Sequence, residues 1–122
     1  DGLVELIMDA KEKGMGIALA SSSTRILVDD SLRLLGIAEQ FDVTVSGDEI
    51  PKKKPAPDVY LKVLELTGVQ AEDAVAVEDS RAGIEAARAA GIFCYGYDNP
   101  TSGVQDISKA DQQIKSIREI KV

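Results

Sequence analysis

The stretch VAVEDSRAG, residues 75–83, decides the fold of this chain. It opens as a short apolar run, ends that run on two adjacent carboxylates, Glu78 and Asp79, and turns directly into small residues. A short run that is apolar throughout is typical of a strand buried on both faces. The stretch therefore predicts a strand that leads through an acidic turn into a helix.

The same unit recurs on both sides of this stretch. We expect strands at 15–20, 41–46, 74–77 and 92–97, and helices at 3–10, 26–35, 59–66 and 83–90, with an edge strand at 112–114 and a terminal helical turn at 116–120. Apolar strands that alternate with helices indicate a parallel sheet with helices on both faces. The prediction is a single α/β domain, a doubly wound, Rossmann-like parallel sheet spanning residues 1–122.

Composition excludes several classes of function. The chain has 14 Lys and Arg against 21 Asp and Glu, and its formal net charge of −7 repels nucleic acid and anionic lipid. No apolar stretch could span a bilayer and no signal segment opens the chain, so we expect a cytoplasmic protein with no membrane partner. With one cysteine and no histidine, the sequence cannot supply a Ser-His-Asp triad or a Cys-based zinc site.

Polar groups follow three of the predicted strands, at the edge where open α/β sheets bind ligands. Ser21 and Ser22 lie at a helix N-terminus, where the helix dipole favours an anion such as phosphate. Lys54 ends a run of three lysines whose backbone is stiffened by prolines. Glu78 and Asp79 supply the hard oxygen atoms that Mg²⁺ prefers. Together these groups suit the binding of a phosphate with Mg²⁺.

Each group also has a purely structural interpretation. Ser22, Ser23 or Thr24 could simply cap the following helix, and Asp79 or Ser80 could cap the next one. The lysines could form a solvated loop. These interpretations leave unexplained why the three features fall at the same end of successive strands.

Three stretches resemble a known family: IALASSS (17–23), VSGDEIPKKKPAPDVYLKVLELTGV (45–69) and VAVEDSRAGIEAARAAGI (75–92). They look like motifs two, three and four of the haloacid dehalogenase superfamily, and most resemble its phosphatase and β-phosphoglucomutase-like branch. The resemblance implies a hydrolase that transfers phosphoryl groups with Mg²⁺, in which an aspartate attacks phosphorus and forms an aspartyl-phosphate. The chain would be a partial core domain that holds these three motifs.

The resemblance also implies a role for each candidate residue. Ser21 would hydrogen-bond the transferring phosphate, and Ser22 would add backbone contacts. Lys54 would stabilise negative charge on the phosphate and on the nucleophile, so Lys54 and Ser21 would be catalytic. Asp79 would hold Mg²⁺ with Glu78 beside it. The partner would be a small phosphorylated metabolite.

One part of the family pattern is missing from the sequence. Family members begin with a strand ending in Asp-x-Asp-x-Thr, which carries the nucleophile, and continue into a helical cap. The resemblance makes this strand the central one, between those at 15–20 and 74–77. We therefore expect the chain alone to be inactive and to self-associate through unpaired strands, as a fragment of a longer parent enzyme. Asp98 also leaves a strand, but a later one than the nucleophile requires.

Two alternatives remain open. A β-phosphoglucomutase-like sugar phosphate mutase would pass through the same phospho-aspartate, and Thr24 and Arg25 could contact its second phosphate. A non-catalytic phosphate-binding or interaction module could keep the fold without the chemistry, because fold alone does not prove catalysis.

Overall fold

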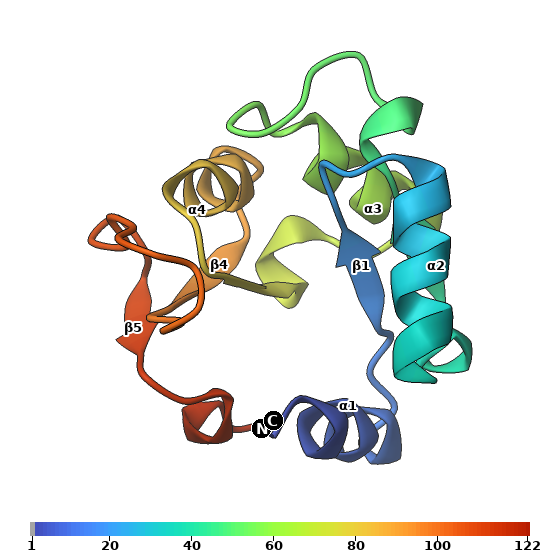
Figure 1. Cartoon of the computed structure of the whole chain (residues 1–122), viewed down its shortest axis with the longest axis horizontal. Helices are drawn as coiled ribbons and strands as arrows, with labels where there is room; N and C mark the ends of the chain where they lie inside the picture. Colours follow the sequence, from blue (N-terminus) through green and yellow to red (C-terminus); the bar gives the residue numbers. More distant parts are fainter. Residues whose placement is uncertain (1) are drawn as a thin grey trace.

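Strands and helices alternate along the chain in the computed structural model, which describes residues 2–122 (Figure 1). The elements are α1 (Leu3–Glu12), β1 (Ala18–Ala20), α2 (Arg25–Leu35), β2 (Val43–Val45), α3 (Asp58–Thr67), β3 (Val75–Glu78), α4 (Arg81–Ala89), β4 (Phe93–Tyr97) and β5 (Gln112–Ile114). Short 3₁₀ turns include Gly47–Glu49 after β2 and Ile117–Glu119 near the C-terminus. The predicted α/β order is confirmed, with strands one to three residues shorter than expected at several ends.

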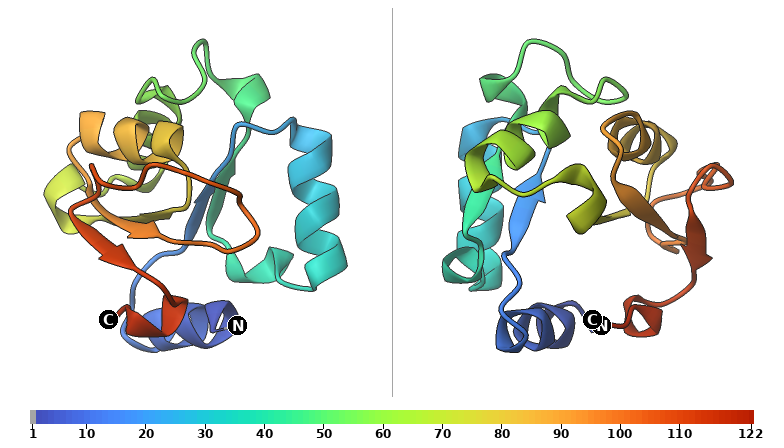
Figure 2. Two further views of the ribbon diagram at one scale, coloured as in Figure 1. Left: turned by 60° about the vertical axis from the view of Figure 1, so that its left-hand side comes forward. Right: turned by 180° about the vertical axis from the view of Figure 1, so that it is seen from behind.

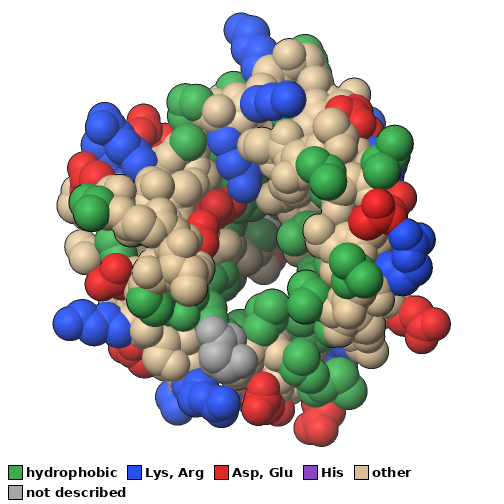
Figure 3. All heavy atoms as spheres, in the orientation of Figure 1, with side chains coloured by type: hydrophobic (Ala, Val, Ile, Leu, Met, Phe, Trp, Pro, Cys, Tyr) green, Lys and Arg blue, Asp and Glu red, His purple; other side chains and the backbone are tan. Residues whose placement is uncertain are grey.

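Every strand pairing is parallel, and the pairings form two separate sheets. β1 pairs with β2, placing Ala20 opposite Val45. β4 lies between β3 and β5, with Glu78 opposite Gly96. Among residues 2–122 no strand pairs with the other edge of β1 or of β3. The space-filling view shows the molecule hollowed through its centre (Figure 3).

Local signals in the sequence set the helix boundaries. The Thr24 hydroxyl accepts a hydrogen bond from the backbone N–H of Leu27 at 3.3 Å, which caps the N-terminus of α2. Gly36 ends α2 and Gly68 ends α3 in the left-handed conformation, with φ of 70° and 71°, which glycine adopts without a steric cost. α2 ends at residue 35, as predicted, and α3 ends one residue after the predicted residue 66.

The main core lies between α3, α4 and the neighbouring strands. Its fully buried members include Val45, Val59, Ile84 and Cys94. Cys94 is a core side chain, and its burial raises the pKa of its thiol to about 12. A separate cluster of Ile114, Ile117 and Ile120 lies beside α1, where the C-terminal 3₁₀ turn Ile117–Glu119 packs on that helix (Figure 2).

One face of β3 is open. Ala76 is buried, whereas Val75 and Val77 keep 52% and 38% of their surface exposed. In a sheet covered on both faces these valines would be buried. None of the described helices is long and apolar enough to cross a membrane.

Candidate active site

Lys54 connects the two sheets at the carboxyl ends of their strands. Its Nζ donates to the carbonyl oxygen of Ala20, the last residue of β1, at 3.1 Å. The same ammonium lies 2.7 Å from Glu78 Oε2, at the end of β3. The lysine loop therefore meets both strand ends, as the sequence predicted for groups at one edge of the fold.

Glu78 is held in a buried network. Only 9% of its side chain and 12% of the Lys54 side chain are exposed. The Tyr60 hydroxyl donates to the same Oε2 atom, and the Lys54 Nζ lies 5.5 Å from the centroid of the Tyr60 ring. Burial and then the negative charge of Glu78 raise the pKa of Tyr60, so its hydroxyl stays protonated and remains a donor. One oxygen of Glu78 is thus engaged by Lys54 and Tyr60.

Gly83 makes room for this carboxylate. A Cβ added at Gly83 would lie 1.9 Å from Glu78 Oε1 and 2.4 Å from its Cδ. The small residue after the two acids therefore lets the first turn of α4 pack directly against the buried glutamate. Ser80 caps the helix by accepting the Gly83 N–H at 3.0 Å.

Asp79 faces a different set of partners. Its Oδ2 accepts hydrogen bonds from Ser102 Oγ at 2.7 Å and from Asn99 Nδ2 at 3.0 Å, both in the loop after β4. Burial raises the pKa of Asp79, but these two hydrogen bonds, a backbone hydrogen bond and the charge of Lys54 together lower it by more, so the pKa lies below the ordinary value. Asp79 is therefore a carboxylate at neutral pH.

Sequence reasoning missed Asn99 and Ser102. The signal that could have found them is their position directly after a strand, at the edge where the other site residues were sought. Asp98, the alternative nucleophile, is exposed in the same loop, and its backbone N–H donates to the carbonyl of Ile114 at 2.8 Å.

The serine run lies at the end of β1. The Ser21 N–H donates to the Val45 carbonyl at 3.0 Å, and Ser21 Oγ accepts from the Ser23 N–H at 3.0 Å. Ser22 is exposed, and a Cβ at Gly47 would lie 2.3 Å from its carbonyl oxygen. The run therefore packs closely on the turn after β2, which leads into the lysine loop.

Arg25 fixes that packing through several contacts. Its guanidinium donates to Thr44 Oγ1 at 2.6 Å and to Glu49 Oε1 at 2.5 Å. Its backbone N–H donates to Asp48 Oδ2 at 2.9 Å. Since Thr24 caps α2, both residues considered for a second phosphate have structural partners instead.

The oxygen donors suit a hard cation. Within residues 2–122 no cluster of three or more His, Cys, Asp or Glu could hold a metal ion. Mg²⁺ does not require such a cluster, because it usually takes one or two carboxylates together with waters and substrate phosphate. Asp79 offers a carboxylate of this kind directly after β3, whereas Glu78, the last residue of β3, already has Oε2 engaged by Lys54 and Tyr60.

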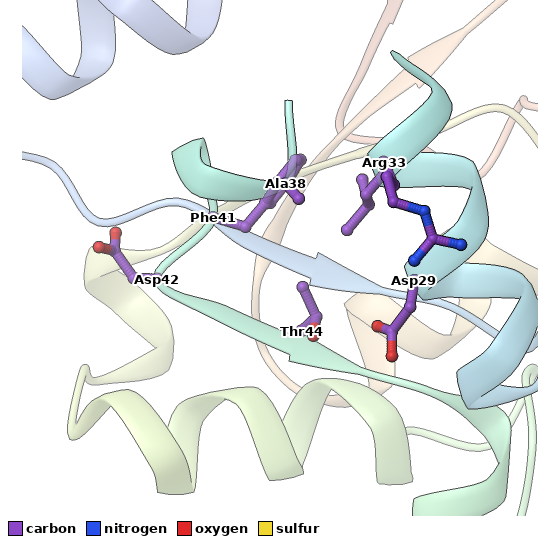
Figure 4. A pocket seen from close by; sticks show the side chains of 7 residues that line it. Asp29, Arg33, Ala38, Phe41, Asp42 and Thr44 are labelled. Atoms are coloured by element: carbon purple, nitrogen blue, oxygen red, sulfur yellow. The ribbon is translucent and has the colours of Figure 1, made fainter. Parts of the chain in front are cut away.

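A shallow pocket lies elsewhere, along the side of β2 (Figure 4). Its volume is about 360 Å³, and its lining includes Asp29 and Arg33 of α2, Phe41, and Thr44 of β2. None of the predicted site residues lines it. The pocket is therefore separate from the groups gathered around Lys54.

Comparisons with known proteins agree with the motifs. Residues 1–97 match the family model described as haloacid dehalogenase-like hydrolase. The chain is 39% identical to Protein CbbY of Rhodobacter capsulatus over 119 residues, covering 95% of this chain and 52% of that protein. It is 42% identical to the phosphorylated carbohydrates phosphatase of Thermotoga maritima over 91 residues, covering 75% of this chain and 42% of that protein.

A solved structure shows the same fold. The crystal structure of the beta-phosphoglucomutase of Clostridium difficile superposes with a TM-score of 0.86 at 28% identity. The match covers 98% of this chain and 51% of that one. The chain thus spans about half the length of several proteins that it matches.

Proposed function

Because the chain belongs to the haloacid dehalogenase-like hydrolase family, we propose that its parent protein, meaning the polypeptide that its gene encodes, hydrolyses a small phosphate monoester. The reaction uses Mg²⁺ and an aspartyl-phosphate whose nucleophile lies outside these 122 residues. The 122 residues are a partial core domain with motifs two to four. The protein acts in the cytoplasm on a phosphorylated metabolite.

The observation that carries this proposal is the position of Lys54 between the ends of β1 and β3. Its ammonium lies beside the carbonyl of Ala20, the residue before Ser21. A transferring phosphoryl group needs cations and hydrogen-bond donors that are already in position. Lys54 supplies the cation, the Ser21 hydroxyl donates a hydrogen bond, and Ser22 adds its backbone N–H.

Asp79 is the principal candidate for holding Mg²⁺, with Glu78 beside it. The ion, when bound, would neutralise charge on the phosphate oxygens. Asp79 suits this role because it is ionised and both of its side-chain hydrogen bonds reach one oxygen, Oδ2. Glu78 also holds the Lys54 ammonium in place through Oε2.

The unpaired edges of β1 and β3 fit a strand that would carry the nucleophile. Lys54 contacts the ends of both strands, so a strand seated between them would end beside its ammonium. Backbone N–H and C=O groups on both edges would gain partners from such a strand. The nucleophile would then lie next to the cation that stabilises its charge.

Hydrolysis is favoured over mutase chemistry. A mutase needs contacts to a second phosphate, and Thr24 and Arg25 were the candidates for them. Arg25 instead binds Thr44 and Glu49, and Thr24 caps α2. A non-catalytic module of the same fold would not need the buried Lys54 at the strand ends.

The test is turnover of p-nitrophenyl phosphate with and without Mg²⁺, measured for the parent protein and for the 122 residues in parallel. We expect Mg²⁺-dependent activity that Lys54→Ala and Asp79→Ala abolish and that Lys53→Ala, at an exposed neighbour, retains. Unchanged turnover in Lys54→Ala and Asp79→Ala would show that the assigned site is wrong. If the 122 residues without any added segment were active and the parent required Asp98, the nucleophile would be Asp98.

A further inference from the structure

We propose that Asn99 and Ser102 are positioning residues that orient Asp79 for a divalent cation, by holding Oδ2 and leaving Oδ1 to bind the ion. This inference rests on the proposed function, because it requires Asp79 to be a metal ligand. It adds a fourth loop, residues 98–102 after β4, to the three loops that the sequence identified.

Both hydrogen bonds reach the same carboxylate oxygen. Ser102 Oγ lies 2.7 Å and Asn99 Nδ2 lies 3.0 Å from Asp79 Oδ2. Two donors on one oxygen fix the rotation of the carboxylate group, so Oδ1 has a defined direction. Mg²⁺ demands nearly ideal octahedral geometry, and a ligand oriented in advance meets that demand with less loss of freedom.

Asn99 is itself oriented by its neighbours. Its Oδ1 accepts from the Thr101 backbone N–H at 3.1 Å and from Thr101 Oγ1 at 2.9 Å. An amide has acceptors at one end and donors at the other, so these bonds direct Nδ2 toward Asp79. The Ser102 N–H donates to the Asn99 carbonyl at 3.1 Å, which holds the two donor residues together.

The contacts of Asp79 are not explained by helix capping. Ser80 already caps α4 by accepting from the Gly83 N–H. Within residues 2–122 the side-chain partners of Asp79 are Asn99 and Ser102. They lie 20 and 23 positions away in the sequence, so the chain brings a separate loop to this carboxylate. An orienting role accounts for that arrangement.

The experiment measures Mn²⁺ affinity of the parent protein by electron paramagnetic resonance of the unbound ion. Ser102→Ala and Asn99→Ala should each weaken Mn²⁺ binding about tenfold, the lower end of the effect of removing a partner that orients a ligand. The Ser102→Thr variant keeps the hydroxyl group and should bind Mn²⁺ about as tightly as the natural protein does. The matched control is Ser108→Ala, which removes a similar hydroxyl bond to Asp106 at 2.6 Å.

Asp79→Asn separates failure of this inference from failure of the proposed function. If Asp79→Asn binds Mn²⁺ as the natural protein does, the proposed metal site is wrong. If Asp79→Asn loses Mn²⁺ while Ser102→Ala and Asn99→Ala retain normal affinity, the positioning role is overturned and the proposed function stands. Thermal unfolding without metal identifies any variant that fails to fold, and the two loop positions test the role independently of each other.

Discussion

Lys54 Nζ lies 2.7 Å from Glu78 Oε2, and the two residues, 24 positions apart, form the buried ion pair of the candidate site. A buried ion pair stabilises a fold little more than a pair of apolar side chains would, because the cost of removing both charges from water offsets much of their attraction. The role of this pair is to position the Lys54 ammonium at the ends of β1 and β3, two strands that do not pair with each other.

Removing the lysine alone should destabilise the fold. Lys54→Ala leaves the Glu78 carboxylate buried without its cation, and we expect a loss of about 3 kcal/mol in the free energy of unfolding. Urea denaturation of the parent protein measures this loss, with Lys53→Ala as the exposed control.

The same measurement in a Glu78→Gln background tests the cause. If the loss comes from the orphaned carboxylate, Lys54→Ala should cost much less when Glu78 is already neutral. Equal losses in the two backgrounds would contradict the argument.

Gly83→Ala should destabilise the protein although alanine favours helices. The added Cβ would lie 1.9 Å from Glu78 Oε1, and that carboxylate cannot easily move because Lys54 and Tyr60 hold its other oxygen. Helix preference contributes about 1 kcal/mol in favour of alanine. Crowding in a packed interior costs about 1–3 kcal/mol, which should outweigh the helix preference and leave a net loss of up to about 2 kcal/mol.

Thermal unfolding of the parent protein checks the Gly83 prediction. Gly16→Ala is the matched control, because the nearest atom to its added Cβ lies at 3.6 Å, an ordinary contact. A Gly83→Ala protein that melted at or above the natural temperature would show that Glu78 is free to shift.

Glu49 should give the fold a pH-dependent contribution. The Ser46 N–H and then the Arg25 guanidinium lower the pKa of Glu49 below its ordinary value of 4.5. A pKa that is lower in the folded state means that the stabilisation is fully present above about pH 4.5 and is lost as the pH falls through the folded-state value.

The stability advantage of the natural protein over Glu49→Gln should therefore shrink as the pH is lowered from 6 towards 3, values chosen to bracket the ordinary range of carboxyl groups. Denaturant unfolding at several pH values measures the difference. Glu39→Gln, at an exposed site, reports the effect of removing a carboxyl group by itself. An advantage that stayed constant over this range would count against the Arg25 contact.

The 122 residues by themselves should self-associate or unfold more easily than the parent protein. The free edges of β1 and β3 expose unpaired backbone groups, and Val75 and Val77 are exposed beside one of them. Such edges pair readily with other chains. Sedimentation velocity and thermal unfolding of both proteins test this, and a monomeric, cooperatively melting 122-residue chain would refute it.

Much of the fold could be predicted because its signals are local. The apolar run at 75–77, the cap of α2 at Thr24 and the end of α2 at Leu35 each depend on residues a few positions away, and each lies where expected. The strand ends at 15–20 and 41–46 were less predictable, because β1 and β2 begin where pairing begins, and pairing depends on a distant strand.

The sequence by itself determined the alternation of strands and helices and the edge at which Ser21, Lys54 and Asp79 would lie, because periodicity and parallel topology suffice for both. Only the tertiary structure decided which groups touch. Glu78 and Asp79 are adjacent in the chain, yet one meets Lys54 and Tyr60 and the other meets Asn99 and Ser102. The physical reason is that Glu78 is the last residue of β3 whereas Asp79 lies in the turn that follows it, and their partners come from loops that the fold brings together.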